Sequence, residues 1–106
     1  MELLKKHIEE LINACNIYQV EKLYIFGSIL RRDFDDKSDI DFIVSLTSKD
    51  PVEYAENYFN LKFELEKIFN RKIDLLEQKA IKNKTFENII NKEKKLVYDR
   101  TNKNLA

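Results

Sequence analysis

Hydrophobic residues recur at helical spacing along the first part of the chain. Apolar residues at positions 4, 8, 11, 12 and 15 share one side and charged residues the other, which predicts an amphipathic helix over residues 2–14. The pattern then changes to β-branched and aromatic residues, which predict a strand over residues 20–27 ending in a tight turn at Gly27. A second strand is predicted over residues 39–46, with Asp39 and Asp41 on one side and apolar residues on the other.

The remaining pattern predicts three or four more elements. Asp50 and Pro51 favour the start of a long helix over residues 51–69, whose apolar face is broad. A short strand over residues 71–78 and a helix over residues 83–95 follow, with Phe86, Ile89 and Ile90 of this helix predicted to face inward. A possible strand over residues 96–99 comes next, and residues 101–106 are predicted to fray. This order, α-β-β-α-β-α with a possible final strand, predicts an α/β (α+β) fold in which helices flank a small mixed sheet, in a single domain over residues 1–106.

Composition and charge narrow the class of protein. With 106 residues, of which 43% are hydrophobic, the chain is expected to form one core. Its 19 basic and 19 acidic residues balance, which argues against stable binding to long nucleic acids through bulk charge. Cys15, the one cysteine, is expected to fill the core in a reducing compartment. No apolar run approaches the roughly 20 residues that cross a bilayer, so we expect a cytoplasmic protein without a membrane segment.

Gly27 and Ser28 follow the first predicted strand and form the first candidate site. Gly27 is the only glycine in the chain, and it allows a sharp turn and the close approach of a ligand to the backbone. The peptide N–H groups that follow it are predicted to begin a short helix, where they lack internal partners and suit a phosphate group. An isolated Gly-Ser pair is also compatible with an ordinary turn that caps a helix.

The second candidate site is the sequence Asp39-Ile40-Asp41. Alternation along a strand puts the two carboxylates on one face, with their Cα atoms roughly 6.5–7 Å apart. They repel unless a cation or a proton lies between them, and Mg²⁺ prefers such oxygen ligands. Asp74, in another short strand, supplies a third carboxylate. A solvated loop for Asp39 and Asp41, and an edge charge facing water for Asp74, are the alternatives. Apolar neighbours argue against the first.

The other aspartates of this region have a simpler interpretation. Asp33, Asp35 and Asp36 lie in a polar loop and are expected to be mostly solvated. They do not form a calcium loop of the EF-hand type, because Lys37 occupies a ligand position and the required glycine is absent.

Order and spacing together resemble a known family. The chain is similar to the minimal nucleotidyltransferases of the DNA polymerase beta-like superfamily, whose pattern is Gly-Ser, a nearby Arg, a Ser before Asp-x-Asp, and a later Asp. The matching residues here are Gly27, Ser28, Arg31, Ser38, Asp39, Asp41 and Asp74. One position departs from the pattern, because Arg32 stands where members often carry glycine, and this puts the path of the loop in question.

The resemblance implies the transfer of AMP from ATP to a hydroxyl group. Gly27, Ser28, Arg31 and Ser38 would bind the nucleotide. Asp39, Asp41 and Asp74 would be the catalytic residues and would hold two Mg²⁺ ions, about 3.5–4 Å apart. Arg31, Arg32 and Lys37 could also neutralise developing charge, although exposed arginines are more often simply solvated.

The acceptor implied by the resemblance is a protein. The resemblance is closest to the MNT antitoxins of HEPN–MNT pairs, which implies a HEPN-domain toxin as partner, modified on a tyrosine and held in a hetero-oligomer. Two alternatives stay open: an antitoxin that is catalytically silent and acts by binding alone, and a transferase acting on a small aminoglycoside-like molecule. Aromatic residues of the 51–69 helix, among them Phe59, Phe63 and Phe69, are expected to form the core, and any that are exposed would form a partner surface.

Overall fold

The fold is built on one mixed sheet. The structure, a computed structural model, describes residues 2–32 and 34–101. The strands are β1 (Val20–Phe26), β2 (Ile40–Leu46), β3 (Ile73–Glu77) and β4 (Lys95–Asp99). They lie in the order β3-β2-β1-β4, with β1 antiparallel to β2 and β4, and β2 parallel to β3. The predicted α/β fold and the possible final strand are therefore confirmed.

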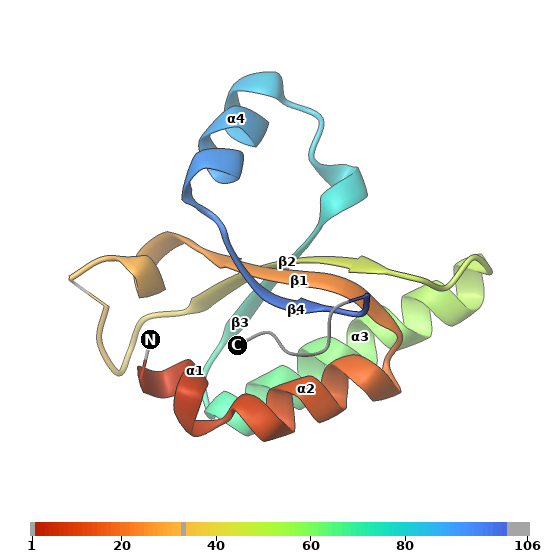
Figure 1. The fold of residues 1–106 in the computed structure, drawn as a ribbon, viewed down its shortest axis with the longest axis horizontal. Coiled ribbons are helices and arrows are strands. Elements are labelled where there is room, and N and C mark those ends of the chain that lie inside the picture. The colour runs from red at the N-terminus through yellow and green to blue at the C-terminus, as the bar shows by residue number, and fades with distance from the viewer. Residues whose placement is uncertain (1, 33, 102–106) are drawn as a thin grey trace.

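Three helices cover one face of this sheet. They are α1 (Glu2–Lys6), α2 (Ile8–Ile17) and α3 (Pro51–Phe69), which lie together below the strands in Figure 1. The fourth helix, α4 (Lys84–Glu93), projects from the sheet on the opposite side (Figure 1). Two short 3-10 turns, η1 (Gly27–Leu30) and η2 (Gln78–Ala80), follow β1 and β3. Within the described residues, no helix combines the length and the apolar character needed to cross a membrane.

The first helix differs from the prediction. The single helix expected over residues 2–14 is interrupted at His7, and α2 then continues to Ile17. His7 is not simply exposed, as an isolated helix residue would be. Its ring contacts Phe69 edge to face, with centroids 5.4 Å apart, and its Nδ1 lies 3.0 Å from Glu10 Oε1. The break therefore places an aromatic contact against the end of α3.

Helix α3 begins and ends where its sequence indicates. The Asp50 carboxylate accepts the N–H of Glu53 at 2.9 Å, and Pro51 occupies the first turn, where a missing donor does no harm. The helix stops at Asn70, whose φ of 50° is left-handed, a conformation that asparagine tolerates. The prediction of a helix over residues 51–69 is confirmed.

The core lies between the sheet and α1–α3. Ile25, Phe42 and Leu65 are fully buried there, and the Phe42 ring packs against Phe69 of α3 at 6.1 Å. Since Phe42 faces the helices, alternation along β2 places Asp41 on the other face of the sheet, which these helices leave uncovered. Cys15 is buried in this core, as expected.

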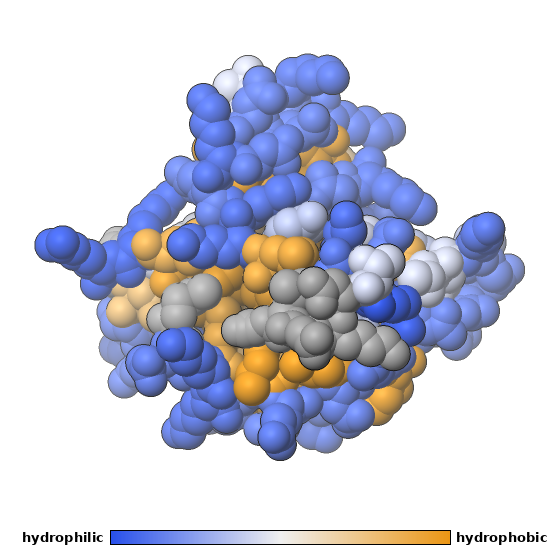
Figure 2. All heavy atoms as spheres, in the orientation of Figure 1, coloured by the Kyte–Doolittle hydropathy of each residue, from blue (hydrophilic) through white to orange (hydrophobic). Residues whose placement is uncertain are grey.

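Several apolar residues expected to be inside are exposed. In α4, Ile90 is buried, but Phe86 and Ile89 are 43% and 50% exposed, so the prediction that all three face inward is wrong for two of them. Figure 2 shows that the α4 region is largely hydrophilic on the visible face. In α3, Phe69 is buried, whereas Phe59 and Phe63 are exposed. A helix that projects from the sheet has little core against which to bury an apolar face.

Candidate active site

The turn at Gly27 is shaped around the side chain of Asp41. Gly27 has a φ of 78°, in the left-handed region, and a Cβ atom at this position would collide with Asp41 Oδ2 and lie 3.3 Å from Asp41 Cγ. The two residues meet because Phe26 pairs with Asp41 in the ladder between β1 and β2. The sequence suggested that glycine allows a ligand to approach. In the structure, the group that approaches it is a carboxylate of the chain.

Asp41 and Asp74 are directly opposite each other on adjacent strands. They are register partners in the parallel ladder between β2 and β3, so their side chains leave the sheet on the same face. Asp41 is half-buried, and Asp74 is exposed. The structure thus brings together two of the three predicted catalytic aspartates, and it leaves one of them open to an incoming molecule.

The electrostatics of this pair favour a bound cation. Burial raises the pKa of Asp41 to about 6, assisted by a hydrogen bond and negative charge from Asp74 and by the charge of Asp39, while the N–H of Ser28 acts in the opposite direction. A divalent cation would stabilise a carboxylate under this repulsion by neutralising its charge. Carboxylate oxygens are also the ligands that Mg²⁺ prefers, so Asp41 and Asp74 fit such an ion.

Asp39 lies just before β2 and has contacts of its own. Its Oδ2 is 3.8 Å from Lys72 Nζ, and its carbonyl oxygen accepts the Ser28 hydroxyl at 3.3 Å. In the part of the chain that the structure describes, no three acidic, histidine or cysteine side chains form a group that could hold a metal ion. The joint role of Asp39, Asp41 and Asp74 as metal ligands therefore stays a prediction.

The predicted nucleotide-binding residues lie around the same turn. The N–H of Arg31 donates to the Ser28 carbonyl at 2.9 Å and closes η1, and the Arg31 side chain is exposed. The helix expected after Gly27 is only this one 3-10 turn, which is too short for a strong helix dipole. The N–H of Ser28 is directed to Asp41. Binding of a phosphate here also stays a prediction.

Ser38 is part of a closed turn with Asp35. Its hydroxyl donates to Asp35 Oδ1 and accepts the Asp35 N–H, both at 3.1 Å. Hydrogen bonds from the Lys37 N–H and from Ser38 lower the pKa of Asp35. Asp35 and Asp36 are exposed, as expected, while Asp33 lies outside the described residues.

Sequence reasoning missed two basic residues beside the site. Lys72 pairs with Asp39, and Arg71 Nη1 donates to the carbonyl oxygens of Asp35 and Ser38 at 2.9 and 3.0 Å. Both residues precede β3, and in the sequence they look like ordinary charged residues of the protein surface. The signal available in the sequence was a basic pair placed just before the strand that carries Asp74.

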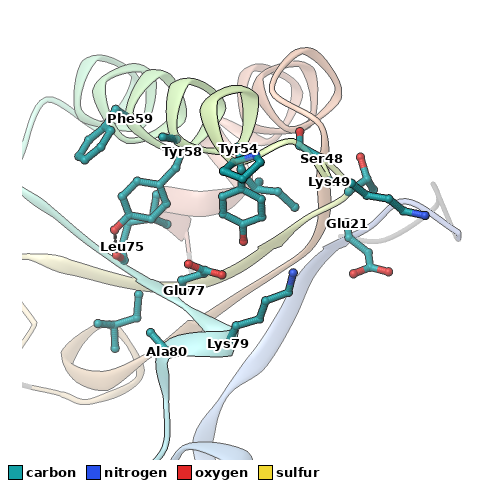
Figure 3. Close-up of a pocket in the computed structure, with 15 residues that line it drawn as sticks. Glu21, Ser48, Lys49, Tyr54, Tyr58, Phe59, Leu75, Glu77, Lys79 and Ala80 are labelled. Atoms are coloured by element: carbon teal, nitrogen blue, oxygen red, sulfur yellow. Dashed lines mark hydrogen bonds between the residues drawn. The ribbon is translucent and has the colours of Figure 1, made fainter.

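A groove lies elsewhere on the molecule. A groove of about 1080 Å³ is lined by residues from α3 and from the carboxyl-terminal ends of β2 and β3, including Tyr54, Tyr58, Phe59 and Glu77 (Figure 3). Asp41 and Asp74 lie toward the amino-terminal ends of those strands. Since β2 and β3 are parallel, the groove and the aspartates occupy opposite ends of the sheet.

A Gly-Ser turn packed against paired aspartates on a small mixed sheet is the arrangement of a nucleotidyltransferase. Comparison with known proteins agrees, because residues 9–103 match the family described as polymerase beta, nucleotidyltransferase. The chain belongs to this family and is a nucleotidyltransferase, so the resemblance and the predicted enzyme class are confirmed.

Relatives and solved structures add detail about similar proteins. The chain is 34% identical over 97 residues, 92% of this chain and 91% of the other, to a protein of Methanocaldococcus jannaschii named "Putative protein adenylyltransferase MJ1379". A solved toxin–antitoxin structure with AMP-PNP has a TM-score of 0.66 and 17% identity over 87% of this chain and 73% of that one. A tri-AMPylated HEPN toxin of Shewanella oneidensis in complex with an MNT antitoxin gives a TM-score of 0.61 and 15% identity, covering 92% of this chain and 73% of the matched one. At these identities, the two structures show the shared fold alone.

Proposed function

We propose that this chain is a Mg²⁺-dependent protein adenylyltransferase that moves AMP from ATP to a tyrosine hydroxyl of a HEPN-domain toxin, and so acts as its antitoxin. The observation that carries this proposal is the Asp41–Asp74 pair, held against the Gly27 turn on the face of the sheet opposite α1–α3. The pKa of Asp41 is raised, first by burial and then by Asp74 and Asp39, and a bound cation would relieve the part that comes from negative charge.

The residues around this pair have distinct proposed roles. Asp39, Asp41 and Asp74 would hold two Mg²⁺ ions, which would neutralise phosphate charge in the transition state. Gly27 and Ser28 would bind the triphosphate through the backbone of their turn, and the Ser28 hydroxyl could exchange its bond with the Asp39 carbonyl for a phosphate oxygen. In the same scheme, the nearby Arg31 and Ser38 would complete nucleotide binding, and Arg31 is exposed enough to reach a phosphate.

The chemistry is a single displacement at the α-phosphorus of ATP. The acceptor hydroxyl oxygen forms a bond to this phosphorus, the bond to the β-phosphate oxygen breaks, and pyrophosphate leaves. The proton of the hydroxyl passes to a carboxylate, for which Asp74 is suited because it is the exposed member of the pair. Asp41, which is half-buried, is better suited to binding a metal ion than to contacting the acceptor hydroxyl.

The protein acceptor is supported by the relatives. A family member 34% identical over most of both chains is named as a protein adenylyltransferase, and a protein of the same fold is found with an AMPylated HEPN toxin. Asp74 is exposed at the surface, which suits the side chain of a folded partner better than a small molecule that needs enclosure.

The test is the intact mass of the HEPN-domain protein encoded beside this chain's gene, after incubation with this chain, ATP and Mg²⁺. We expect the partner to gain one or more AMP groups. Asp39→Asn/Asp41→Asn should give no gain, and Asp36→Asn, an exposed carboxyl in the preceding loop, should act as the wild type. If the mass of the partner is unchanged after incubation with folded wild-type chain, transfer to that partner is ruled out.

A catalytically silent antitoxin is the second candidate. It is favoured by the pairing of Asp39 with Lys72 and by the lack, among the described residues, of a ready group of three metal ligands. The same experiment separates the two functions. If the partner keeps its mass and still forms a stable complex with both the wild type and Asp39→Asn/Asp41→Asn, neutralisation occurs by binding alone.

A further inference from the structure

Arg71 joins the loop before the aspartates to the strand that carries Asp74. It follows Asn70, which ends α3, and its Nη1 donates to the carbonyl oxygens of Asp35 and Ser38 at 2.9 and 3.0 Å. Its guanidinium carbon lies 4.8 Å from the centre of the Phe34 ring. One side chain therefore holds both ends of the turn 35–38 and the aromatic residue before it.

This turn leads directly into Asp39, the first of the three proposed metal ligands. The N–H of Ser38 donates to the Asp35 carbonyl at 3.2 Å, so the turn is closed on itself before Asp39 begins. The next residue after Arg71 continues the attachment. The Lys72 carbonyl accepts the N–H of Ile40 at 3.2 Å, and Lys72 Nζ lies 3.8 Å from Asp39 Oδ2. The path of the chain into Asp39 is thus set from the segment 71–72.

The guanidinium of Arg71 is only partly satisfied by hydrogen bonds. Among the described residues, Arg71 Nε is buried and has no hydrogen-bond partner, and an unpaired buried donor is unfavourable for folding. Both carbonyl oxygens that Arg71 does bind belong to the loop before Asp39. Departures from the most stable arrangement are expected where a residue serves a functional site.

We propose that Arg71 is a positioning residue for the transfer reaction. By fixing the turn 35–38, it would set where the chain enters Asp39, and so the position from which the Asp39 carboxylate can reach a Mg²⁺ ion held at Asp41. This inference rests on the proposed function, because it assumes that Asp39 and Asp41 hold the metal. It assigns Arg71 no contact with ATP or with the acceptor.

The test compares Arg71→Met and Arg71→Lys with a control arginine. Arg100 also binds backbone carbonyls, with Nε 2.8 Å from Val20 O and Nη2 3.3 Å from Cys15 O, but it does so away from the turn 35–38. In the first measurement, Mg²⁺ is titrated into the protein in the presence of AMP-PNP, and binding is detected as a rise in the melting temperature. In the second, AMP transfer is measured as a function of the ATP and Mg²⁺ concentrations. Hydrogen exchange of the amides in residues 35–40 is measured in parallel.

We expect the amide hydrogens of residues 35–40 to exchange faster in Arg71→Met than in the wild type. The variant should need about tenfold to a hundredfold more Mg²⁺ for the same binding and activity, the range found when partners of metal ligands are removed. Its kcat should fall while its KM for ATP changes little. Arg71→Lys, which keeps a donor, should recover part of both losses. Arg100→Met should melt at a lower temperature and keep the wild-type Mg²⁺ dependence.

Two results would overturn the positioning role. If Arg71→Met keeps the wild-type exchange and Mg²⁺ dependence, Arg71 does not act on Asp39, and the proposed function is unaffected. If the wild type neither responds to Mg²⁺ with AMP-PNP nor transfers AMP, the proposed function fails, and the role of Arg71 fails with it. Should Arg71→Met fold poorly, Phe34→Leu, which removes the ring beneath the guanidinium and keeps an apolar side chain against the core, is expected to show the same effects in smaller measure.

Discussion

At the scale of single residues, Gly27 has little freedom to change. Alanine there would have to adopt a φ of 78°, and its Cβ would meet the Asp41 carboxylate. We expect Gly27→Ala to lower the free energy of unfolding by about 1–3 kcal/mol, the range for a strained backbone position, and to abolish transfer because Asp41 is displaced. Urea unfolding and the partner's intact mass measure the two effects.

The control is Asn70→Gly, at another left-handed position. Asn70 has a φ of 50° at the end of α3, so glycine should be neutral or slightly stabilising there, with transfer unchanged. An active Gly27→Ala of wild-type stability would show that the turn can relax and that its close approach to Asp41 is not required.

Asp41 makes the stability of the metal-free protein depend on pH. Its pKa is raised from 3.8 to about 6, so between these values the folded chain binds more protons than the unfolded chain. The stabilisation is complete below pH 4 and is lost as pH rises through 6. We expect Asp41→Asn to be more stable than the wild type at pH 8 by about 1–2 kcal/mol, after allowance for solvent screening of a partly exposed carboxyl.

Urea unfolding at several pH values, without Mg²⁺, checks this prediction. Asp36→Asn removes an exposed carboxyl nearby and should follow the wild-type profile. If Asp41→Asn is no more stable than the wild type at pH 8, the carboxylate is already neutralised by the chain itself, and the pair has no need of a cation.

The sequence allowed the residues of the site to be predicted, but only some of their contacts. Gly27, Asp41 and Asp74 are exceptions to local patterns: a lone glycine after a strand, and charges within apolar strands. Such exceptions can be recognised in the amino-acid sequence alone. Arg71, in contrast, looks like an ordinary charged surface residue in the sequence. Its hydrogen-bond acceptors lie 33 and 36 residues earlier in the chain, so only the folded structure reveals its contacts.

At the scale of elements, the helix caps should differ in their effect. Asp50 caps α3 and Asn83 caps α4, each by accepting an N–H three residues later, at 2.9 and 3.0 Å. We expect Asp50→Ala to lower the free energy of unfolding by about 1 kcal/mol, because α3 packs on the core. Asn83→Ala should mainly fray α4, which has few buried residues, and change global unfolding little.

Hydrogen exchange with urea unfolding distinguishes these outcomes. Faster exchange confined to α4 in Asn83→Ala, with an unchanged unfolding midpoint, agrees with a locally stable element. An equal loss of global stability in both variants would mean that α4 unfolds together with the core, against what its exposed Phe86 and Ile89 indicate.

Elements were predicted best where local and tertiary preferences agree. Helix α3 has a cap, a proline and a left-handed end, and its predicted bounds are those of the structure. The first helix has no residue that forbids continuation at position 7, so its break depends on contacts such as that of His7 with Phe69. The apolar pattern of α4 is periodic, but the pattern cannot tell that the helix stands away from the sheet.

At the scale of the whole molecule, Cys15 can report on global opening and on ligand binding together. It is fully buried, and burial raises its pKa to about 12, so neither its position nor its ionisation permits reaction with a thiol reagent in the folded state. We expect labelling only through opening of the core. Mg²⁺ with AMP-PNP should slow it by the factor 1 + [L]/Kd, because a ligand that binds only the folded state lowers the open population.

The measurement is the labelling rate of Cys15 by mass, with and without Mg²⁺ and AMP-PNP, at reagent concentrations where opening and closing are faster than reaction. Asp39→Asn/Asp41→Asn should label at a rate that the ligands do not change, although its own stability sets a different starting rate. Equal slowing of wild type and variant would place nucleotide binding away from the aspartates. Fast labelling of the unliganded wild type would mean that the core around Cys15 opens without global unfolding.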